Sequence, residues 1–382
     1  MMKKITAAAF ASASLLLLPL PAFDFGGKIG STTKYQGNAF DSLKLYESST
    51  SHLWVSSLLN EDTKLRFNAD GSYEFRYDET DASYKNILDV NLLKLSGTLS
   101  SGRYTKLNFA AGRFFVSDVT GIVFSQVSDG FYTKFETPSL DFDVYAGTTA
   151  LLNAHDVTII TPETTAYNPD FNTVYAACPP YVPVGISMNF PSLFLNQTLT
   201  AEGWGFIDFS SDKYNRWYGT AAVSGPLAGN VFYSLMTTAG TEKFDSISDL
   251  SKVTVTLYPV PTASIAVSGV YASGKNGFLS GFTGFTSRTA YLSLPEPEYT
   301  GIIKADLSGS YTVTSNFCLS GGGACVFACP DDIVTYDGLQ WSFNAVWNIF
   351  YDLQLSAGAY QYYAQDSAGN KTCFIVTGTF VF

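Results

Sequence analysis

The segment Thr63–Asp78 alternates between two kinds of side chain with a period of two residues. One set is apolar, aromatic or small: Leu65, Phe67, Ala69, Gly71, Tyr73, Phe75 and Tyr77. The other set is polar and mostly charged: Lys64, Arg66, Asn68, Asp70, Ser72, Glu74, Arg76 and Asp78. A β-strand places alternate side chains on opposite faces. Burying unpaired charges is costly, so this strand needs water on one face and an apolar medium on the other.

The same alternation returns along the chain, for example at 252–257, 303–312 and 341–349. Segments of roughly ten residues are separated by turns that alternate between short and long, which is typical of outer-membrane barrels. Counting them from Phe23–Tyr35 to Lys371–Phe382 gives about eighteen strands. The segment Gly185–Phe190, which we expect to end in a turn at Pro191-Ser192, is short for a strand, so sixteen is the alternative. A soluble β-sandwich or solenoid is the competing architecture.

The composition fits a barrel better than a helical membrane protein. The chain is 46% hydrophobic and 15% aromatic, with 14% charged residues, against about 25% charged in ordinary soluble proteins. Beyond the N-terminus no apolar run is long enough for a membrane-spanning helix. A closed barrel leaves no backbone group unpaired in lipid. We therefore predict an all-β fold, a transmembrane antiparallel up-and-down β-barrel.

Residues 1–22 are predicted to be a signal peptide. Lys3 and Lys4 precede an apolar stretch, Ile5–Leu20, and Leu20-Pro21-Ala22 offers a cleavage site. Residues 23–382 are then the barrel, with a long extracellular loop at about 152–183. A second connection, Arg113–Gly130, is unusually apolar, and we expect Val119–Val127 to fold inward and narrow the pore. The loop at about 152–183 is the alternative plug.

A barrel of sixteen or eighteen strands encloses a water-filled channel, whereas eight strands fill with side chains. Strand parity predicts which charged residues line that channel. The candidates are Lys64, Arg66, Asp70, Glu74, Arg76, Lys106, Lys134, Glu136, Asp141, Asp143, Glu202, Arg216, Lys252, Lys304 and Asp306. Opposing charges across a narrow lumen would create a transverse field that sorts polar solutes.

Other functions have little support in the sequence. The net charge of −11 excludes a generic nucleic-acid binder, which needs a basic surface. The two histidines, His52 and His155, have no partners that suggest catalysis, so we expect no enzyme, no cofactor and no metal site. Five cysteines leave their pairing open, for example Cys329 with Cys178 or Cys373.

The chain ends on an aromatic strand, KTCFIVTGTFVF, with Phe380 and Phe382 on one face. This end resembles the assembly signal of bacterial outer-membrane barrels, and the whole pattern resembles bacterial outer-membrane porins. The resemblance implies an outer-membrane location, contact with lipid and with the barrel assembly machinery, and passive diffusion of small polar solutes; it leaves a homo-trimer open. Two alternatives remain. One is a sugar-specific channel, if Tyr132, Tyr145, Tyr218, Tyr258, Tyr360 and Tyr362 form a line down one wall. The other is an adhesin or structural barrel without transport.

Overall fold

The computed structural model describes residues 23–39, 42–80, 82–102, 104–149, 181–209, 214–242, 244–275, 279–286, 300–331, 333–366 and 369–382, with the backbone of 159–161 and 164–167. The predicted signal peptide and most of the predicted loop 152–183 lie outside these residues. In the described part of the chain, no helix is long and apolar enough to cross a membrane.

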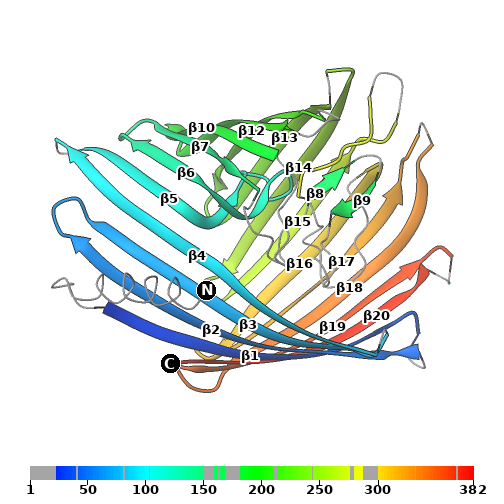
Figure 1. Ribbon diagram of the computed structural model, residues 1–382. Helices are drawn as coiled ribbons and strands as arrows, with labels where there is room; N and C mark the ends of the chain where they lie inside the picture. The colour runs from blue at the N-terminus through cyan, green and yellow to red at the C-terminus, as the bar shows by residue number, and fades with distance from the viewer. Residues whose placement is uncertain are drawn as a thin grey trace.

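Antiparallel strands make up nearly all of the described chain (Figure 1). They are β1 (Phe23–Gly37), β2 (Lys44–Asn60), β3 (Leu65–Asp78), β4 (Ser83–Ser101), β5 (Thr105–Ser117), β6 (Ser125–Glu136), β7 (Asp141–Thr148), β8 (Ile159–Thr161), β9 (Thr164–Tyr167), β10 (Tyr181–Phe194), β11 (Gln197–Asp208), β12 (Arg216–Ala228), β13 (Val231–Glu242), β14 (Ser246–Val260), β15 (Ala263–Ala272), β16 (Ile302–Thr314), β17 (Phe317–Ala328), β18 (Thr335–Asn348), β19 (Leu353–Ala364) and β20 (Lys371–Val381).

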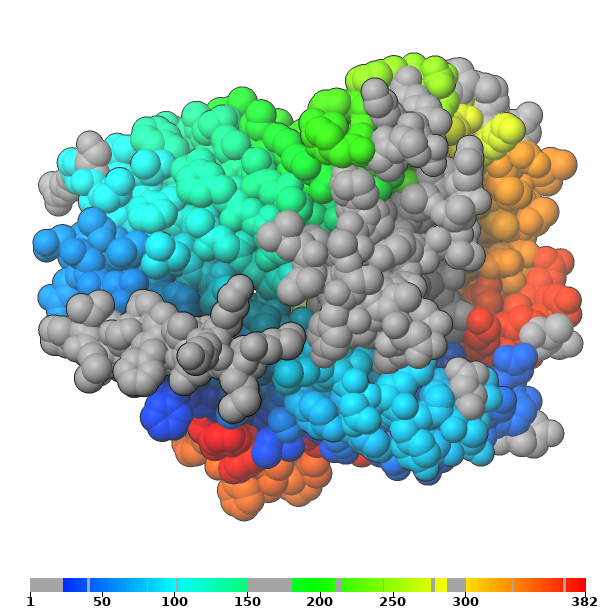
Figure 2. All heavy atoms as spheres, in the orientation of Figure 1, coloured from blue at the N-terminus to red at the C-terminus, as the bar shows by residue number. Residues whose placement is uncertain are grey.

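The sheet closes on itself as an 18-stranded barrel, and β8 and β9 form a separate two-stranded hairpin. Each barrel strand pairs with its neighbours in the chain, β7 pairs with β10, and β20 pairs with β1 to complete the ring. In Figure 2 the first strands, in blue, border the last ones, in red. The prediction of about eighteen strands in an antiparallel up-and-down barrel is confirmed, and the sixteen-strand alternative is wrong.

The segment that raised the sixteen-strand alternative is longer than expected. We predicted a strand at Gly185–Phe190 and a turn at Pro191-Ser192, but β10 runs from Tyr181 to Phe194. The turn lies at Leu195-Asn196, where both residues have positive φ angles of 49° and 61°. Two consecutive left-handed residues make the tight turn that suits a two-residue hairpin. Proline misled the prediction, because it sits inside β10 at a register irregularity rather than in the turn.

The two faces of the barrel wall differ as the alternation predicts. Large apolar side chains such as Leu53, Leu88 and Val267 are exposed on the outer face. The registers keep polar residues together on the inner face, for example Ser72 opposite both His52 and Asp89. The interior therefore carries the chemistry, and the outer face offers an apolar belt.

Candidate functional site

An aromatic wall covers part of the barrel interior. Tyr145 on β7, Trp204 and Phe206 on β11, and Tyr218 on β12 are all buried. The connection between β5 and β6 packs Phe124 against this wall, with ring-centroid distances of 5.1 Å to Trp204 and 5.4 Å to Phe206. A second segment, 279–286, adds Phe282 and Phe285 to the same cluster. The two connections thus meet on the aromatic wall, where the ring centroids of Phe124 and Phe285 lie 6.3 Å apart.

The first connection, Asp118–Phe124, is short and firmly held. The N–H of Val119 donates to Oε2 of Glu202 at 2.8 Å, which ties the loop to β11. The N–H groups of Phe285 and Thr286 donate to the carbonyl oxygen of Val123, at 2.9 and 3.0 Å. The predicted inward fold is confirmed for Val119–Phe124, whereas the rest of the predicted segment, 125–127, begins β6.

Asp118 organises this loop from within. Its carboxylate accepts the N–H of Phe124 at Oδ1 and the N–H of Thr120 at Oδ2, both at 2.9 Å. The side chain is almost fully buried. Burial raises the pKa of Asp118 above its usual range, and the hydrogen bonds from Thr120 and Phe124 oppose that rise. When the loop is packed against the aromatic wall, a state that we call the seated loop, burial therefore disfavours the charged form of the Asp118 carboxyl group.

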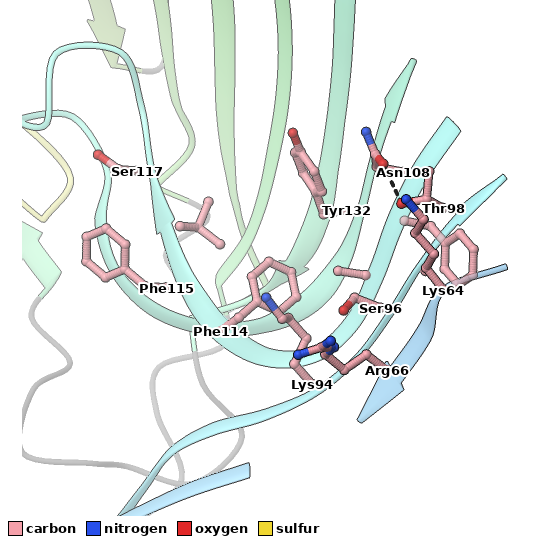
Figure 3. Close-up of a pocket in the computed structure, with 14 residues that line it drawn as sticks. Lys64, Arg66, Lys94, Ser96, Thr98, Asn108, Phe114, Phe115, Ser117 and Tyr132 are labelled. Carbon is pink, nitrogen blue, oxygen red and sulfur yellow. Dashed lines mark hydrogen bonds between the residues drawn. The ribbon is translucent and has the colours of Figure 1, made fainter. Parts of the chain in front are cut away.

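A basic hollow of about 560 Å³ lies on one side of the loop. Lys64, Arg66 and Lys94 provide its positive charge, and no acidic residue is among the described residues that line it. Ser96, Thr98, Asn108, Phe114 and Tyr132 complete much of the lining, and Figure 3 shows these side chains around the space. We call this space the basic hollow.

An acidic hollow of about 410 Å³ lies next to it. Asp118, Asp143 and Glu202 supply its negative charge, and no Lys or Arg is among its described lining residues. Its neutral polar lining consists of Ser117, Tyr132, Tyr145, Ser187, Asn189, Thr198, Thr200 and the indole of Trp204. Val116, Ser117 and Tyr132 line both hollows, so the two charged spaces adjoin at the end of β5. The barrel interior is therefore polarised beside the inward loop.

Several predicted pore-lining residues neutralise one another instead of facing a hollow. The guanidinium of Arg76 forms hydrogen bonds with both carboxylate oxygens of Glu74, at 2.9 and 3.0 Å. Nζ of Lys134 lies 3.4 Å from Glu136 and 3.2 Å from Asp141. Each pair couples residues on one strand or on adjacent strands. These groups contribute less field to the lumen than isolated charges would.

Two other predicted residues are buried. Arg216 is completely buried between the rings of Tyr214 and Phe285, each 5.5 Å from its Cζ, and its Nε lies 3.6 Å from Glu242. Lys304 on β16 is 3% exposed. Its neighbours in the same region, Lys252 on β14 and Asp306 on β16, are partly exposed. Lys106 lies exposed on β5.

Asp70 lies in a polar cluster rather than in a charged pair with a lysine. Its Oδ1 accepts a hydrogen bond from Nδ2 of Asn91 at 2.9 Å and lies 3.4 Å from Nδ1 of His52. His52 therefore has a structural partner inside the barrel. Among the described residues, no group of three His, Cys, Asp or Glu side chains could hold a metal ion. His155 lies outside the described residues.

Sequence reasoning missed Lys94 because of a bulge. The register between β3 and β4 shifts between Asp70 and Gly71, where Asn91 is the extra residue on β4. A bulge reverses the strand parity beyond it. Asp89 and Lys94 are five residues apart, yet they pair opposite the inward residues Ser72 and Asn68. Strict alternation from Asp89 would have placed Lys94 outside.

The barrel seam joins the last residue to the first strand. Phe382 and Gly27 exchange two backbone hydrogen bonds of 2.9 Å, and the Phe382 ring lies so close to Gly27 that a Cβ there would approach it to 2.4 Å. Phe380 stacks on Phe382 with ring centroids 6.1 Å apart. The suggested Cys329–Cys373 disulfide does not form, because both residues are free thiols; the other suggested partner, Cys178, lies outside the described residues.

Comparisons with known proteins agree on the architecture. No family model matches the chain, and no curated protein matches it. The chain is similar in structure to Acinetobacter baumannii OccAB4, with a TM-score of 0.63 and 11% identity over 95% of this chain and 99% of that one. Pseudomonas aeruginosa OccK5 (OpdH) has a TM-score of 0.62 and 10% identity over 94% and 98%. The outer membrane protein OprD of the same organism has a TM-score of 0.62 and 10% identity over 95% and 94%. At such identities, the likeness establishes the fold.

Proposed function

We propose that this protein is an outer-membrane porin, a water-filled channel for passive diffusion of small polar solutes. The observation that carries the proposal is the pair of adjoining charged hollows inside an 18-stranded barrel with an apolar exterior. Charged side chains in a wide barrel need water around them, and a continuous watery interior conducts ions. Similarity in fold to the outer membrane protein OprD supports the same location.

Reconstitution of the purified protein in a planar lipid bilayer tests this proposal. Discrete single-channel current steps in potassium chloride are the expected result. A barrel that inserts but passes no current would overturn it and would favour the adhesin or structural alternative. Insertion is established separately by the shift in gel mobility between heated and unheated samples.

The sugar-specific alternative has weaker support. The tyrosines proposed as a line lie on β6, β7, β12, β14 and β19 rather than along one wall. Tyr145 and Tyr218 are buried in the aromatic cluster, and Tyr360 donates a hydrogen bond to Asn344. A general or weakly selective channel therefore fits the interior better than a channel with an aromatic path for neutral sugars.

Three further parts of the proposal concern partners. The outer apolar belt would contact outer-membrane lipid, and the Phe380–Phe382 end would be read by the barrel assembly machinery. A homo-trimer stays open, and size measurement in mild detergent would decide it. Residues 1–22 would direct export and be removed, which mass determination of the mature protein checks.

A further inference from the structure

We propose that Thr286 is a positioning residue for the constriction, and that residues 279–286, which we call the strut, hold the inward loop 118–124 in its seated position. The strut belongs to the long connection between β15 and β16, whereas the inward loop connects β5 to β6. One connection would thus set the width of a pore that another connection narrows. The effect on pore width rests on the proposed channel function.

The strut is attached to the barrel wall independently of the inward loop. The N–H of Ser280 donates to a carbonyl oxygen of β14, and the N–H of Phe282 donates to the carbonyl oxygen of Ser273, both at 2.8 Å. The hydroxyl of Tyr218 on β12 donates to the carbonyl oxygen of Thr283 at 2.6 Å. These bonds join the strut to β12, to β14 and to the end of β15, so they do not depend on the loop.

Two phenylalanines pack the strut against the same wall. Phe282 and Phe285 are both fully buried. The ring of Phe285 stacks on that of Phe206 in β11, with centroids 3.9 Å apart and an interplanar angle of 14°. Burial of two large apolar side chains holds a short segment firmly. The strut is therefore the fixed support in this contact, and the inward loop is the part that can move.

The end of the strut holds the peptide groups on both sides of Phe124. The N–H groups of Phe285 and Thr286 donate to the carbonyl oxygen of Val123, at 2.9 and 3.0 Å. The hydroxyl of Thr286 accepts the N–H of Ser125 at 2.7 Å. Thr286 is 5% exposed, and an N–H that loses its acceptor in a buried contact is costly. The Thr286 hydroxyl therefore stabilises the seated loop.

The two ends of the inward loop are held by different elements. The N–H of Val119 donates to Glu202 on β11 at 2.8 Å, and Thr286 holds the other end. Between these ends, the Asp118 carboxylate binds the N–H groups of Thr120 and Phe124. Because this network makes the loop one unit, its release at the strut should also increase opening at its distant end. A purely local role of Thr286 would leave the distant end unaffected.

Amide hydrogen exchange at the Val119 N–H, measured by NMR on the detergent-solubilised protein, tests the proposal. Thr286→Val keeps the shape of the side chain and removes the hydroxyl. We expect the Val119 N–H to exchange about tenfold faster in this variant, the effect of losing one buried hydrogen bond. Thr286→Ser keeps the hydroxyl and should exchange as the unaltered protein does. An unchanged Val119 rate in folded Thr286→Val, or equal acceleration in Thr286→Ser, would overturn the proposal.

The Phe282 N–H reports whether the strut itself stays in place. Its exchange should be unchanged in Thr286→Val, because its bond to Ser273 belongs to the wall attachment. The matched control is Thr237→Val, which removes an exposed hydroxyl on β13, and neither N–H should change in it. Equal acceleration at Phe282 and Val119 in Thr286→Val would mean that the whole region loosens, and it would refute the fixed strut.

Single-channel recording measures the consequence for the pore. Thr286→Val should show a larger mean conductance and more current noise, and Thr286→Ser and Thr237→Val should not. Faster exchange with unaltered conductance would refute the link between the strut and pore width. The exchange measurement needs no current, so the two proposals fail separately. A protein with the expected exchange but no current keeps the strut and loses the channel function, and a conducting protein without that exchange pattern loses the strut.

Discussion

Phe124 is the residue whose loss should most change the width of the channel. It is fully buried, and its ring lies within 6.3 Å of four other rings, those of Tyr145, Trp204, Phe206 and Phe285. Replacing a buried Phe with Ala costs about 3–5 kcal/mol. If that cost falls on the seated loop alone, the ratio of seated to unseated loop drops by at least about a hundredfold.

Single-channel recording of Phe124→Ala measures this directly. We expect a larger mean conductance and more current noise, because the loop 118–124 spends more time away from the wall. Hydrogen exchange should be faster at the backbone N–H of position 124, which donates to Asp118 in the seated loop of the unaltered protein. The matched control is Phe135→Ala on β6, whose ring is exposed on the outer face, and its conductance should be unchanged. A folded Phe124→Ala barrel with unaltered conductance, noise and exchange would refute the reasoning that this packing sets the constriction.

Three further perturbations test other parts of the structure. Phe382→Ser, or removal of the last three residues, should lower the amount of folded barrel in the outer membrane, as seen by heat-modifiable gel mobility; normal insertion would contradict an assembly role. Gly27→Val should do the same from the other side of the seam, because a Cβ there would approach the Phe382 ring to 2.4 Å; a Gly27→Val barrel that closes normally would show that the contact is unimportant. The third perturbation is a change of pH, because the pKa of Asp118 is raised when the loop is packed against the wall. The packed loop is therefore most stable below pH 3.8, the ordinary pKa of an Asp side chain, and it loses stability as the pH rises through the raised pKa. Conductance should therefore fall on acidification, and Asp118→Asn should remove the part of this response that Asp118 carries; an identical pH profile in Asp118→Asn would exclude that contribution.

Much of the fold follows from local rules that the sequence expresses directly. A period of two fixes which side chains face outward, and alternating turns fix the strand number and the closure of β20 on β1. Strand β1 pairs with β20 from Lys28 opposite Val381 to Gly37 opposite Thr372, and this pairing closes the barrel through its terminal strand. The exact positions of the turns were harder to predict from the sequence. Leu195-Asn196 forms the turn, but these residue types favour a turn less than the Pro191-Ser192 pair that precedes them.

The interior could be predicted only in part, because parity says which face a residue is on and not what it meets there. Strand parity predicts that both Arg76 and Arg216 face the lumen. In the structure, Arg76 pairs with Glu74, whereas Arg216 is buried under Phe285. Both outcomes depend on neighbours that are far away in sequence. Lys94 was missed for a different reason, since a single bulge reverses the parity of β4.

The aromatic wall also depends on glycines that no apolar pattern would mark as important. A Cβ at Gly130 or Gly147 would approach the Tyr145 hydroxyl to 2.6 or 2.3 Å, and a Cβ at Gly185 would approach the Trp204 ring to 2.7 Å. The absence of side chains on these neighbouring strands leaves room for both rings against the inner wall. Phe124 packs against these rings, and the carboxylate of Glu202, two residues before Trp204, holds the same loop through Val119. The glycines in β6, β7 and β10 therefore belong to the mechanism that seats the loop, because a side chain at any of them would displace the surface on which Phe124 packs.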